Sequence, residues 1–427
     1  MKTDVLIVGC GCSGLFCALN LPRELNITVI TKSTTERNDS FLAQGGICVL
    51  RDENDFDSFF EDTLKAGHYE NDRKSVEIMI NSSREVINQL VSLGVEFDRE
   101  ENGEYAYTKE GAHSRARILY HKDMTGKEIT SKLLAEAKGR SNIKILDHTQ
   151  IIDIIEKDSE CVGAVLLTPE KHIEIVQCRY VVLASGGIGG LYKHSTNFRH
   201  LTGDSLAIAL EHNIELKNLS YVQIHPTTFY QVDSDERSFL ISESVRGEGA
   251  KLYDKHMNRF ANELLPRDLL TKAINEQMAK DKTEHVWEDL RPIGEEEINS
   301  HFPNIARHCL ENGYNVLERC IPVVPAQHYF MGGIKVNYES KTSMEGLYAV
   351  GETACNGVHG KNRLASNSLL ESLVFAKRAA LDIAKKPREC TILPEIDMEK
   401  YHDVPNLKME RKKRVLQEIE KDGLKNV

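Results

Sequence analysis

The sequence has 427 residues, 41% of them hydrophobic and 28% charged, with a formal net charge of −11. This length and composition are typical of a globular protein with two or three domains and exclude a largely disordered or membrane-embedded chain. The acidic balance argues against nucleic acid as a partner, because phosphate binding needs a net basic face.

The ten cysteines form no C-x-x-C pair, which favours a reducing cytosol over a disulfide framework or a structural zinc site. The apolar run from Val5 to Leu21 is interrupted by glycines and lacks an A-x-A cleavage site, so we do not interpret it as a secretory signal. No later stretch approaches the ~20 apolar residues of a membrane helix. We therefore expect a cytoplasmic protein without a metal site.

The first predicted element is a β-branched strand at residues 4–9, which is followed by a helical pattern at residues 13–21. The glycines between them match G-x-G-x-x-G. Gly9 allows the tight turn, Gly11 lets the backbone approach a pyrophosphate, and Gly14 lets the helix pack on the strand. The start of the helix would then face the phosphate.

Cys10 and Cys12 occupy the variable positions of this motif. Read as metal ligands, they would need distant partners, because alternate residues of one turn cannot complete a tetrahedral site. We interpret them as small buried residues.

A second strand is predicted at residues 26–31, and it ends at Thr31 and Lys32. A typical NAD site has an acidic residue at this position to bind the ribose. The absence of this acidic residue favours FAD over NAD, because FAD is also bound through other contacts. Lys32 could alternatively be a solvated side chain without a role in binding.

Strand-then-glycine patterns return at residues 180–192 and 346–352. We therefore predict an α/β fold in which a discontinuous Rossmann-like FAD-binding domain comprises residues 1–218 and 328–385. Residues 219–327 would form an inserted α+β capping domain that carries substrate-binding residues.

Ser366 precedes an apolar helical pattern, so it marks a helix start whose free N–H groups could face an anionic flavin edge. Residues 386–427 are predicted to be a short C-terminal helical tail. Within it, residues 409–424 are rich in charge and are expected to form a solvated helix without chemistry.

Four side chains lie next to residues that fix the backbone: His225, Arg267, His328 and Arg363. Singly, each is more often structural than catalytic. Together they offer two guanidinium and two imidazole groups, a suitable receptor for a dicarboxylate. The glycine pair in "AQGGI" (43–47) predicts either close backbone approach to a flat ligand or a plain turn.

Five segments occur in order along the chain: "AQGGI", "QIHPT", "PRDLLTKAI", "PAQHYFMGGI" and "GVHGKNRLASNSLLES". Together they resemble the aspartate-oxidising branch of the succinate dehydrogenase and fumarate reductase flavoprotein family, from residue 4 to about residue 385. The resemblance implies FAD-dependent oxidation of L-aspartate to iminoaspartate with hydride transfer to flavin N5, the first step of quinolinate and NAD synthesis. FAD should be noncovalent, because "NDSFL" stands where membrane-complex relatives carry the attaching histidine.

The resemblance also implies site residues by motif. Arg267 would be catalytic, and because a guanidinium stays protonated, its role as base or as clamp and proton relay is open. Glu110 and Glu243 would lie near the amino group. Substrate binding is implied for His225, Ser242, His328 and Arg363. FAD contacts are implied for Gly9, Cys10, Gly11, Cys12, Ser13, Gly14, Lys32, Ser40, Ala43, Gln44, Gly45, Gly46, Asp204, Glu352, Ser368 and Leu369.

The alternative enzyme is a soluble fumarate reductase or succinate dehydrogenase flavoprotein subunit. A noncatalytic FAD-binding protein is a second alternative, which the density of polar groups disfavours. L-Aspartate, fumarate and a quinolinate synthase are the expected partners. The electron acceptor, whether oxygen, fumarate or a quinone, and the oligomeric state stay open.

Overall fold

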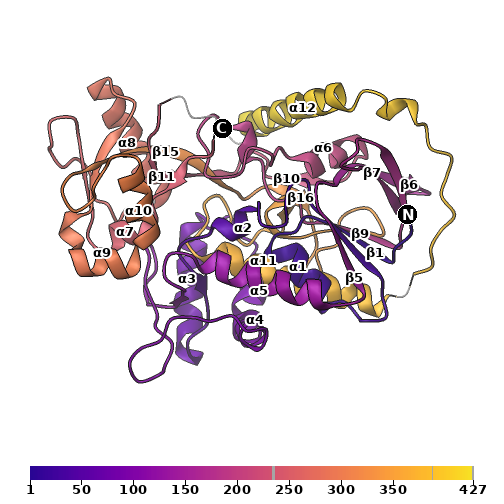
Figure 1. Cartoon of the computed structure of the whole chain (residues 1–427), viewed down its shortest axis with the longest axis horizontal. Coiled ribbons are helices and arrows are strands. Elements are labelled where there is room, and N and C mark those ends of the chain that lie inside the picture. Colours follow the sequence, from indigo (N-terminus) through magenta and orange to yellow (C-terminus); the bar gives the residue numbers. More distant parts are fainter. Residues whose placement is uncertain (233–235, 387, 426–427) are drawn as a thin grey trace.

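The computed structural model describes residues 1–232, 236–386 and 388–425. Figure 1 shows an elongated molecule with two lobes. One lobe contains a parallel sheet with helices against it, and the other gathers the strands and helices that lie between about residues 222 and 330. The last helix crosses the top of the first lobe in this view.

A five-stranded parallel sheet forms the centre of the first lobe, in the order β17-β9-β1-β2-β5. Its strands are β1 (Val5–Val8), β2 (Ile27–Ile30), β5 (Ile143–Leu146), β9 (Tyr180–Leu183) and β17 (Leu347–Ala349). The strand expected at residues 26–31 is thus confirmed. Because β17 pairs with β9, a segment from late in the chain completes a sheet begun by the N-terminus.

Helices cover one face of this sheet, where Val5 and Ile7 join their apolar core. Helix α1 packs against both α11 and α5, and α11 also packs against α4. Leu6 and Val8 point to the opposite face, as strand alternation requires, and join a second core with β7 and α6. The helices of this lobe are α1 (Cys12–Asn20), α2 (Asp39–Leu42), α3 (Phe56–Ala66), α4 (Arg73–Ser92), α5 (Thr125–Gly139), α6 (Asp204–Glu211) and α11 (Asn367–Lys385).

Smaller sheets complete this lobe. An antiparallel sheet, absent from the sequence-based expectation, joins β6 (Gln150–Lys157), β7 (Glu160–Leu167) and β8 (Ile173–Gln177). The remaining short strands are β3 (Ile47–Cys48), β4 (Ile118–Leu119), β10 (Leu216–Lys217), β16 (Gly333–Lys335) and β18 (Ala354–Cys355).

The second lobe is built on a five-stranded antiparallel sheet, in the order β12-β11-β15-β14-β13. Its strands are β11 (Val222–Phe229), β12 (Phe239–Leu240), β13 (Lys251–Tyr253), β14 (Val286–Asp289) and β15 (Ile321–Phe330). Its helices are α7 (Glu243–Gly247), α8 (Arg267–Asp281), α9 (Glu295–His301) and α10 (Pro303–Glu311). The predicted boundary at residue 327 falls inside β15, so this strand spans both predicted domains.

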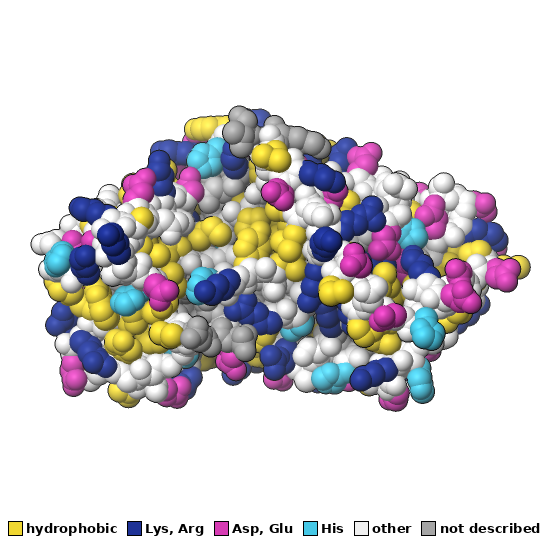
Figure 2. All heavy atoms as spheres, turned by 90° about the horizontal axis from the view of Figure 1, so that it is seen from above, with side chains coloured by type: hydrophobic (Ala, Val, Ile, Leu, Met, Phe, Trp, Pro, Cys, Tyr) yellow, Lys and Arg dark blue, Asp and Glu magenta, His cyan; other side chains and the backbone are white. Residues whose placement is uncertain are grey.

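The helix predicted at residues 409–424 is present as part of α12 (Val404–Lys425), and most of its side chains are exposed, but the prediction missed one face that packs against α6. Val415 is 1% exposed and Arg411 8% exposed, because valine joins the core beneath and the guanidinium pairs with Glu211. Both acidic and basic side chains cover the part of the surface where this helix runs (Figure 2). Within the described ranges, no helix is both long and apolar enough to cross a membrane.

Candidate functional site

A single large cavity reaches from the glycine-rich turn after β1 to the second lobe. It contains about 1720 Å³ of empty space, counting the part open to solvent. The residues that line it come from both lobes, which suits a long ligand that extends from the glycine-rich turn toward Arg267. Every residue predicted for the site lines it, except Gly14.

The turn after β1 leaves space for a ligand at the start of α1. Gly9 has φ +124°, and a Cβ there would lie 2.0 Å from the carbonyl oxygen of Ala184, so no other residue fits. Gly11 is the N-cap of α1 and provides no side-chain cap. The N–H of Cys12, the first residue of α1, donates to Oγ of Ser40 at 3.1 Å, so this hydroxyl lies where the phosphate motif predicts an anion.

Gly14 has a different place from its neighbours. A Cβ at Gly14 would lie 2.1 Å from the carbonyl oxygen of Gly9, which shows that the residue packs helix against turn and does not face the ligand. Cys10 and Cys12 are buried, and burial raises the pKa of Cys10 to about 12 and that of Cys12 to about 11. Both are thiols at neutral pH, which fits small packing residues better than metal ligands.

Lys32 is not simply solvated. Its Nζ lies 2.7 Å from Oδ2 of Asp204, in the first turn of α6, and 2.8 Å from the carbonyl oxygen of His200. Burial acts to raise the pKa of Asp204, but Lys32 and its hydrogen bonds hold that pKa below its usual value. An ion pair thus occupies the end of β2, where a single acidic residue is usual.

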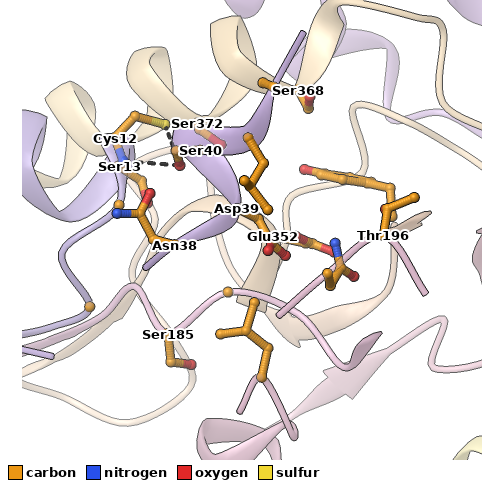
Figure 3. Close-up of a pocket in the computed structure, with 18 of the residues that line it drawn as sticks. Cys12, Ser13, Asn38, Asp39, Ser40, Ser185, Thr196, Glu352, Ser368 and Ser372 are labelled. Carbon is orange, nitrogen blue, oxygen red and sulfur yellow. Dashed lines mark hydrogen bonds between the residues drawn. The ribbon is translucent and has the colours of Figure 1, made fainter. Parts of the chain in front are cut away.

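The middle of the cavity has acidic side chains that sequence reasoning only partly identified. Figure 3 shows Ser13, Asn38 and Ser40 near the start of α1, with Asp39 and Glu352 toward the centre. Burial raises the pKa of Asp39 to about 7, and burial together with Asp39 raises that of Glu352 to about 8. Glu352 accepts a hydrogen bond from the N–H of Phe330 at 2.9 Å, which fixes it against β15.

Other lining residues were missed by the sequence-based prediction. Some of them adjoin predicted ones: Asn38 and Asp39 precede Ser40, and Ser372 lies one helical turn after Ser368. Others can be identified only from the structure, because Thr196 and Arg237 do not belong to a recognisable sequence motif. The missed lining residues include Asn38, Asp39, Gln150, Ser185, Thr196, Arg237 and Ser372, of which Figure 3 labels Asn38, Asp39, Ser185, Thr196 and Ser372.

A second helix start faces the cavity at α11. Ser366, its N-cap, has φ +60° and makes no side-chain cap, and Ser368 and Leu369 line the cavity wall. A Cβ at Gly45 would lie 2.5 Å from Oε1 of Glu110, so the glycine pair lets the backbone lie close to this side chain, and its approach to a flat ligand stays a prediction. This arrangement presents free N–H groups to a flat ligand.

Arg267, the first residue of α8, lies at the end of the cavity toward the second lobe. Its Nε lies 2.6 Å from Oε2 of Glu243, and its Nη1 donates to Oε1 of Gln223 at 2.8 Å. Nothing among the described residues accepts a hydrogen bond from Nη2. Gln223 was missed, although it lies two residues before His225 on β11 and therefore shares its face.

Two carboxylates meet beside Arg267. Glu110 accepts hydrogen bonds from the hydroxyl groups of Ser366 at 2.6 Å and Ser244 at 3.0 Å. Burial and the charge of Glu243 raise the pKa of Glu110. Burial also acts to raise the pKa of Glu243, but Arg267 and Arg246 hold it below the usual value. The two groups therefore differ, with Glu243 the more firmly ionised.

Two neutral imidazoles form the next part of the wall. The rings of His225 and His328 lie 5.1 Å apart between centroids, and Nδ1 of His328 lies 2.8 Å from the hydroxyl of Thr196. Burial and the nearby Arg267 lower the pKa of both histidines well below the usual value. They are uncharged at neutral pH, so they can bind a carboxylate only through N–H donation.

Arg363 supplies the second guanidinium. Its Nη1 donates to Oγ of Ser368 at 2.8 Å, and its Cζ lies 4.4 Å from the ring centroid of Tyr329. Burial and the charge of Arg267 lower its pKa to about 10, so it stays protonated. Its Nε and the Nε2 of His225 are buried and have no hydrogen-bond partner among the described residues. These orphaned groups indicate a missing anionic ligand.

The arrangement fits FAD together with a dicarboxylate. The cradle at Gly9 and Gly11 and the uncapped start of α1 suit a pyrophosphate, and the α11 start suits a flavin edge. The residues that would bind FAD noncovalently are the predicted set without Gly14. No histidine lies within residues 38–46, the segment on which the expectation of noncovalent FAD is based.

Comparison with known proteins agrees with this interpretation. The FAD binding domain family matches residues 4–369. An L-aspartate oxidase from Clostridium perfringens is 50% identical over 93% of this chain and 91% of its own length. An L-aspartate oxidase from Clostridium acetobutylicum is 47% identical over 90% of this chain and 88% of its own length. A quinol fumarate reductase structure from E. coli has a TM-score of 0.84 at 28% identity, covering 90% of this chain and 70% of that one.

Proposed function

Because this chain belongs to the L-aspartate oxidase family of FAD-binding flavoproteins, we propose that it oxidises L-aspartate to iminoaspartate in the cavity described above. FAD is its cofactor. The observation that carries the substrate assignment is the pairing of two buried carboxylates, Glu110 and Glu243, with a wall of guanidinium and imidazole donors. L-Aspartate has the complementary charges, since it carries one ammonium group and two carboxylates.

The donor wall is proposed to bind both substrate carboxylates. Arg363 offers its unpaired Nε, and His225 offers Nε2 in the tautomer in which Nδ1 accepts from the N–H of Thr227 at 3.2 Å. Ser242 and His328 complete the set. Because these groups are buried and pre-oriented, they bind the dianion without reorganising, and they fix Cα in one position.

Glu110 and Glu243 are proposed to act on the amino group. The oxidation removes a hydride from Cα and one proton from nitrogen, and bound FAD supplies the acceptor for the hydride. Glu110, whose pKa is raised, is suited to accept a proton that the ammonium must lose. Glu243 forms an ion pair with Arg267 at 2.6 Å and therefore keeps its negative charge beside the substrate.

Arg267 is proposed to clamp the substrate and to support proton movement through its pairing with Glu243. Its Nε and Nη1 are already bonded to Glu243 and Gln223, which leaves Nη2 to contact the substrate. A guanidinium does not act as a free base at neutral pH. The geometry therefore supports the clamp, with Glu243 as the anionic partner that holds the guanidinium in place.

The deciding experiment is anaerobic reduction of the purified yellow protein. L-Aspartate should bleach the ~450 nm flavin band, and succinate at the same concentration should not. Bleaching by succinate alone would replace this proposal with a succinate dehydrogenase activity. Bleaching by neither, with FAD bound, would leave the pocket without a catalytic role.

A second activity, fumarate reduction, is supported by the similarity to a fumarate reductase structure and by the same dicarboxylate wall. The enzyme reduced by L-aspartate would then pass its electrons to fumarate and form succinate. Fumarate should restore the flavin band of the anaerobically reduced protein. If the band returns only with oxygen, fumarate is not an acceptor.

The place of the reaction in the cell is also a proposal. Iminoaspartate hydrolyses readily, so a quinolinate synthase that takes it directly is the expected partner, in the cytoplasm. Co-purification of the two proteins, or faster quinolinate formation than free diffusion of iminoaspartate allows, would support the pairing. If the rate of quinolinate formation does not depend on the ratio of the two proteins beyond what free diffusion of iminoaspartate predicts, the pairing is contradicted.

A further inference from the structure

The C-terminal helix α12 packs on the turn that presents Asp204 to the cavity. Gly203, in the left-handed region with φ +71°, immediately precedes Asp204, and a Cβ at Gly203 would lie 3.5 Å from Cγ1 of Val415. One turn earlier in α12, Arg411 donates from Nε and Nη2 to Glu211 at the end of α6, at 2.7 Å and 2.6 Å. The helix therefore holds both ends of α6, which carries Asp204.

A hydrogen-bonded chain connects this helix to the cavity. Lys408 of α12 donates from Nζ to Oε1 of Gln150. Nε2 of Gln150 donates to Oδ2 of Asp204 at 3.0 Å, and the same oxygen pairs with Lys32 at 2.7 Å. Because an ammonium can only donate, Lys408 holds the Gln150 amide with its NH₂ group toward Asp204.

The hydrogen-bonded partners of Lys408 are part of the cavity wall, whereas Lys408 itself is not. Lys32, Gln150 and Asp204 line the main cavity. Lys408 and Arg411 line a small depression that shares Gln150, Thr202 and Asp204 with it. A change at Lys408 would therefore reach a ligand through its neighbours and not by direct contact.

The position of these residues identifies which half of FAD they serve. In a dinucleotide fold, the start of the first helix receives the pyrophosphate, and the end of the second strand receives the adenosine ribose. Lys32 follows β2, and Asp204 and Gln150 surround it. The substrate-binding arginines lie toward the second lobe, so the flavin half belongs there.

We propose that Lys408 is a positioning residue for the adenosine half of FAD, and that α12 is part of the cofactor site. Lys408 orients Gln150, which together with Lys32 orients Asp204. The inference rests on FAD as the cofactor and is independent of which dicarboxylate is oxidised. It also gives a role to a segment for which the sequence predicted none.

The test compares Lys408→Met with Lys413→Met, which removes the same charge from an exposed position of the same helix. FAD is removed from each purified protein, and its affinity is measured by titration, with ADP and FMN as competing half-ligands. We expect Lys408→Met to weaken FAD and ADP about tenfold and to leave FMN unchanged, while Lys413→Met matches the parent. Lys408→Arg, which keeps a donor, should stay within about threefold of the parent.

The half-ligands distinguish positioning from general damage. Equal losses for FMN and ADP would mean that the variant disturbs the fold, and an unchanged FAD affinity would mean that Lys408 does not reach the cofactor. Either result overturns the proposal. Because no substrate is added, failure of the L-aspartate assignment would leave this test unaffected.

Discussion

At the scale of single residues, Arg267 has the most demanding environment in the site. It is 8% exposed, its Nε lies 2.6 Å from Glu243, and its charge lowers the pKa of both wall histidines. We expect Arg267→Leu to bind FAD normally and to lose about a thousandfold or more in kcat/KM for L-aspartate, since both the clamp and the partner of Glu243 disappear.

Two measurements make this prediction specific. The visible spectrum reports bound FAD, and anaerobic flavin reduction reports the chemical step. Arg307→Leu removes an exposed arginine from the same lobe and should behave like the parent. Normal turnover in Arg267→Leu would remove this residue from the catalytic set.

Glu110 should produce a pH dependence specific to substrates that carry an ammonium group. Burial and Glu243 raise its pKa, so protonation on acidification begins at a higher pH than for an ordinary glutamate. The protonated form no longer attracts the ammonium. The Kd for L-aspartate should therefore rise on acidification, beginning above the pH range in which an ordinary glutamate is protonated, and more steeply than the Kd for succinate.

Glu110→Gln should remove this difference, because an amide does not titrate. The exposed Glu104→Gln in the same segment is the matched control and should keep the parent profile. The Kd for succinate is measured from the absorbance of the oxidised flavin, which succinate does not reduce. The Kd for L-aspartate is measured by rapid anaerobic mixing, from the dependence of the flavin reduction rate on L-aspartate concentration, which separates binding from the chemical step. Identical pH profiles for the two ligands in the parent would argue against contact between Glu110 and the ammonium.

At the scale of elements, two glycines in the turn from β1 to α1 have different roles: Gly9 is needed for the fold, and Gly11 is expected to leave space for the cofactor. Gly9→Ala combines a positive φ with a Cβ 2.0 Å from the carbonyl oxygen of Ala184, and we expect it to lower the free energy of unfolding by about 2–4 kcal/mol. Gly11 has an ordinary φ of −79°, and the nearest atom to its Cβ would be Oγ of Ser40, at 3.0 Å.

Gly11→Ala should therefore leave the unfolding free energy of the FAD-free protein within about 1 kcal/mol of the parent. Its methyl group points to where the pyrophosphate approaches, so FAD affinity should fall at least tenfold. Denaturant unfolding without FAD, combined with FAD titration, distinguishes the two variants. Equal loss of stability in both would mean that Gly11 serves folding and not the cofactor.

The same elements show what could be predicted from the sequence. Buried parallel strands have continuous β-branched runs, so β1 and β2 were found within one or two residues, and the glycine turn was placed between strand and helix. The site residues came from motifs, and all except Gly14 line one cavity. Gly14 was misplaced because its motif position does not distinguish contact with a ligand from contact with the strand.

The missed features depend on contacts between distant segments. Helix α12 seemed solvated because its charged residues dilute a thin apolar stripe, yet Arg411 is buried by pairing with Glu211, 200 residues earlier. Lys32 likewise acquires its role from Asp204, 172 residues away. Local patterns contain no information on such pairs, since the partner is set by the fold.

At the scale of the whole molecule, the substrate site exists only where the two lobes meet. Arg267 and His225 come from the second lobe, whereas Arg363 and Glu110 come from segments packed against the parallel sheet. Strands β11 and β15 run along the connection. In the proposed site, a bound dicarboxylate would bridge the lobes, and its binding free energy would add to the stability of their arrangement.

This geometry predicts that succinate stabilises the FAD-bound protein against heat. At about 100 times its Kd, a ligand that binds only the folded state contributes about 2.7 kcal/mol, which should raise Tm by a few degrees in a chain of this size. Arg363→Ala should abolish the rise, because Arg363 provides one side of the bridge and its Nε is unpaired without a ligand. Arg378→Ala, in helix α11 after Arg363, removes a guanidinium that pairs with Glu339 and should retain it. If succinate stabilises Arg363→Ala as much as the parent, the dicarboxylate binds without contacting the sheet side of the cavity, and the bridge between lobes does not form.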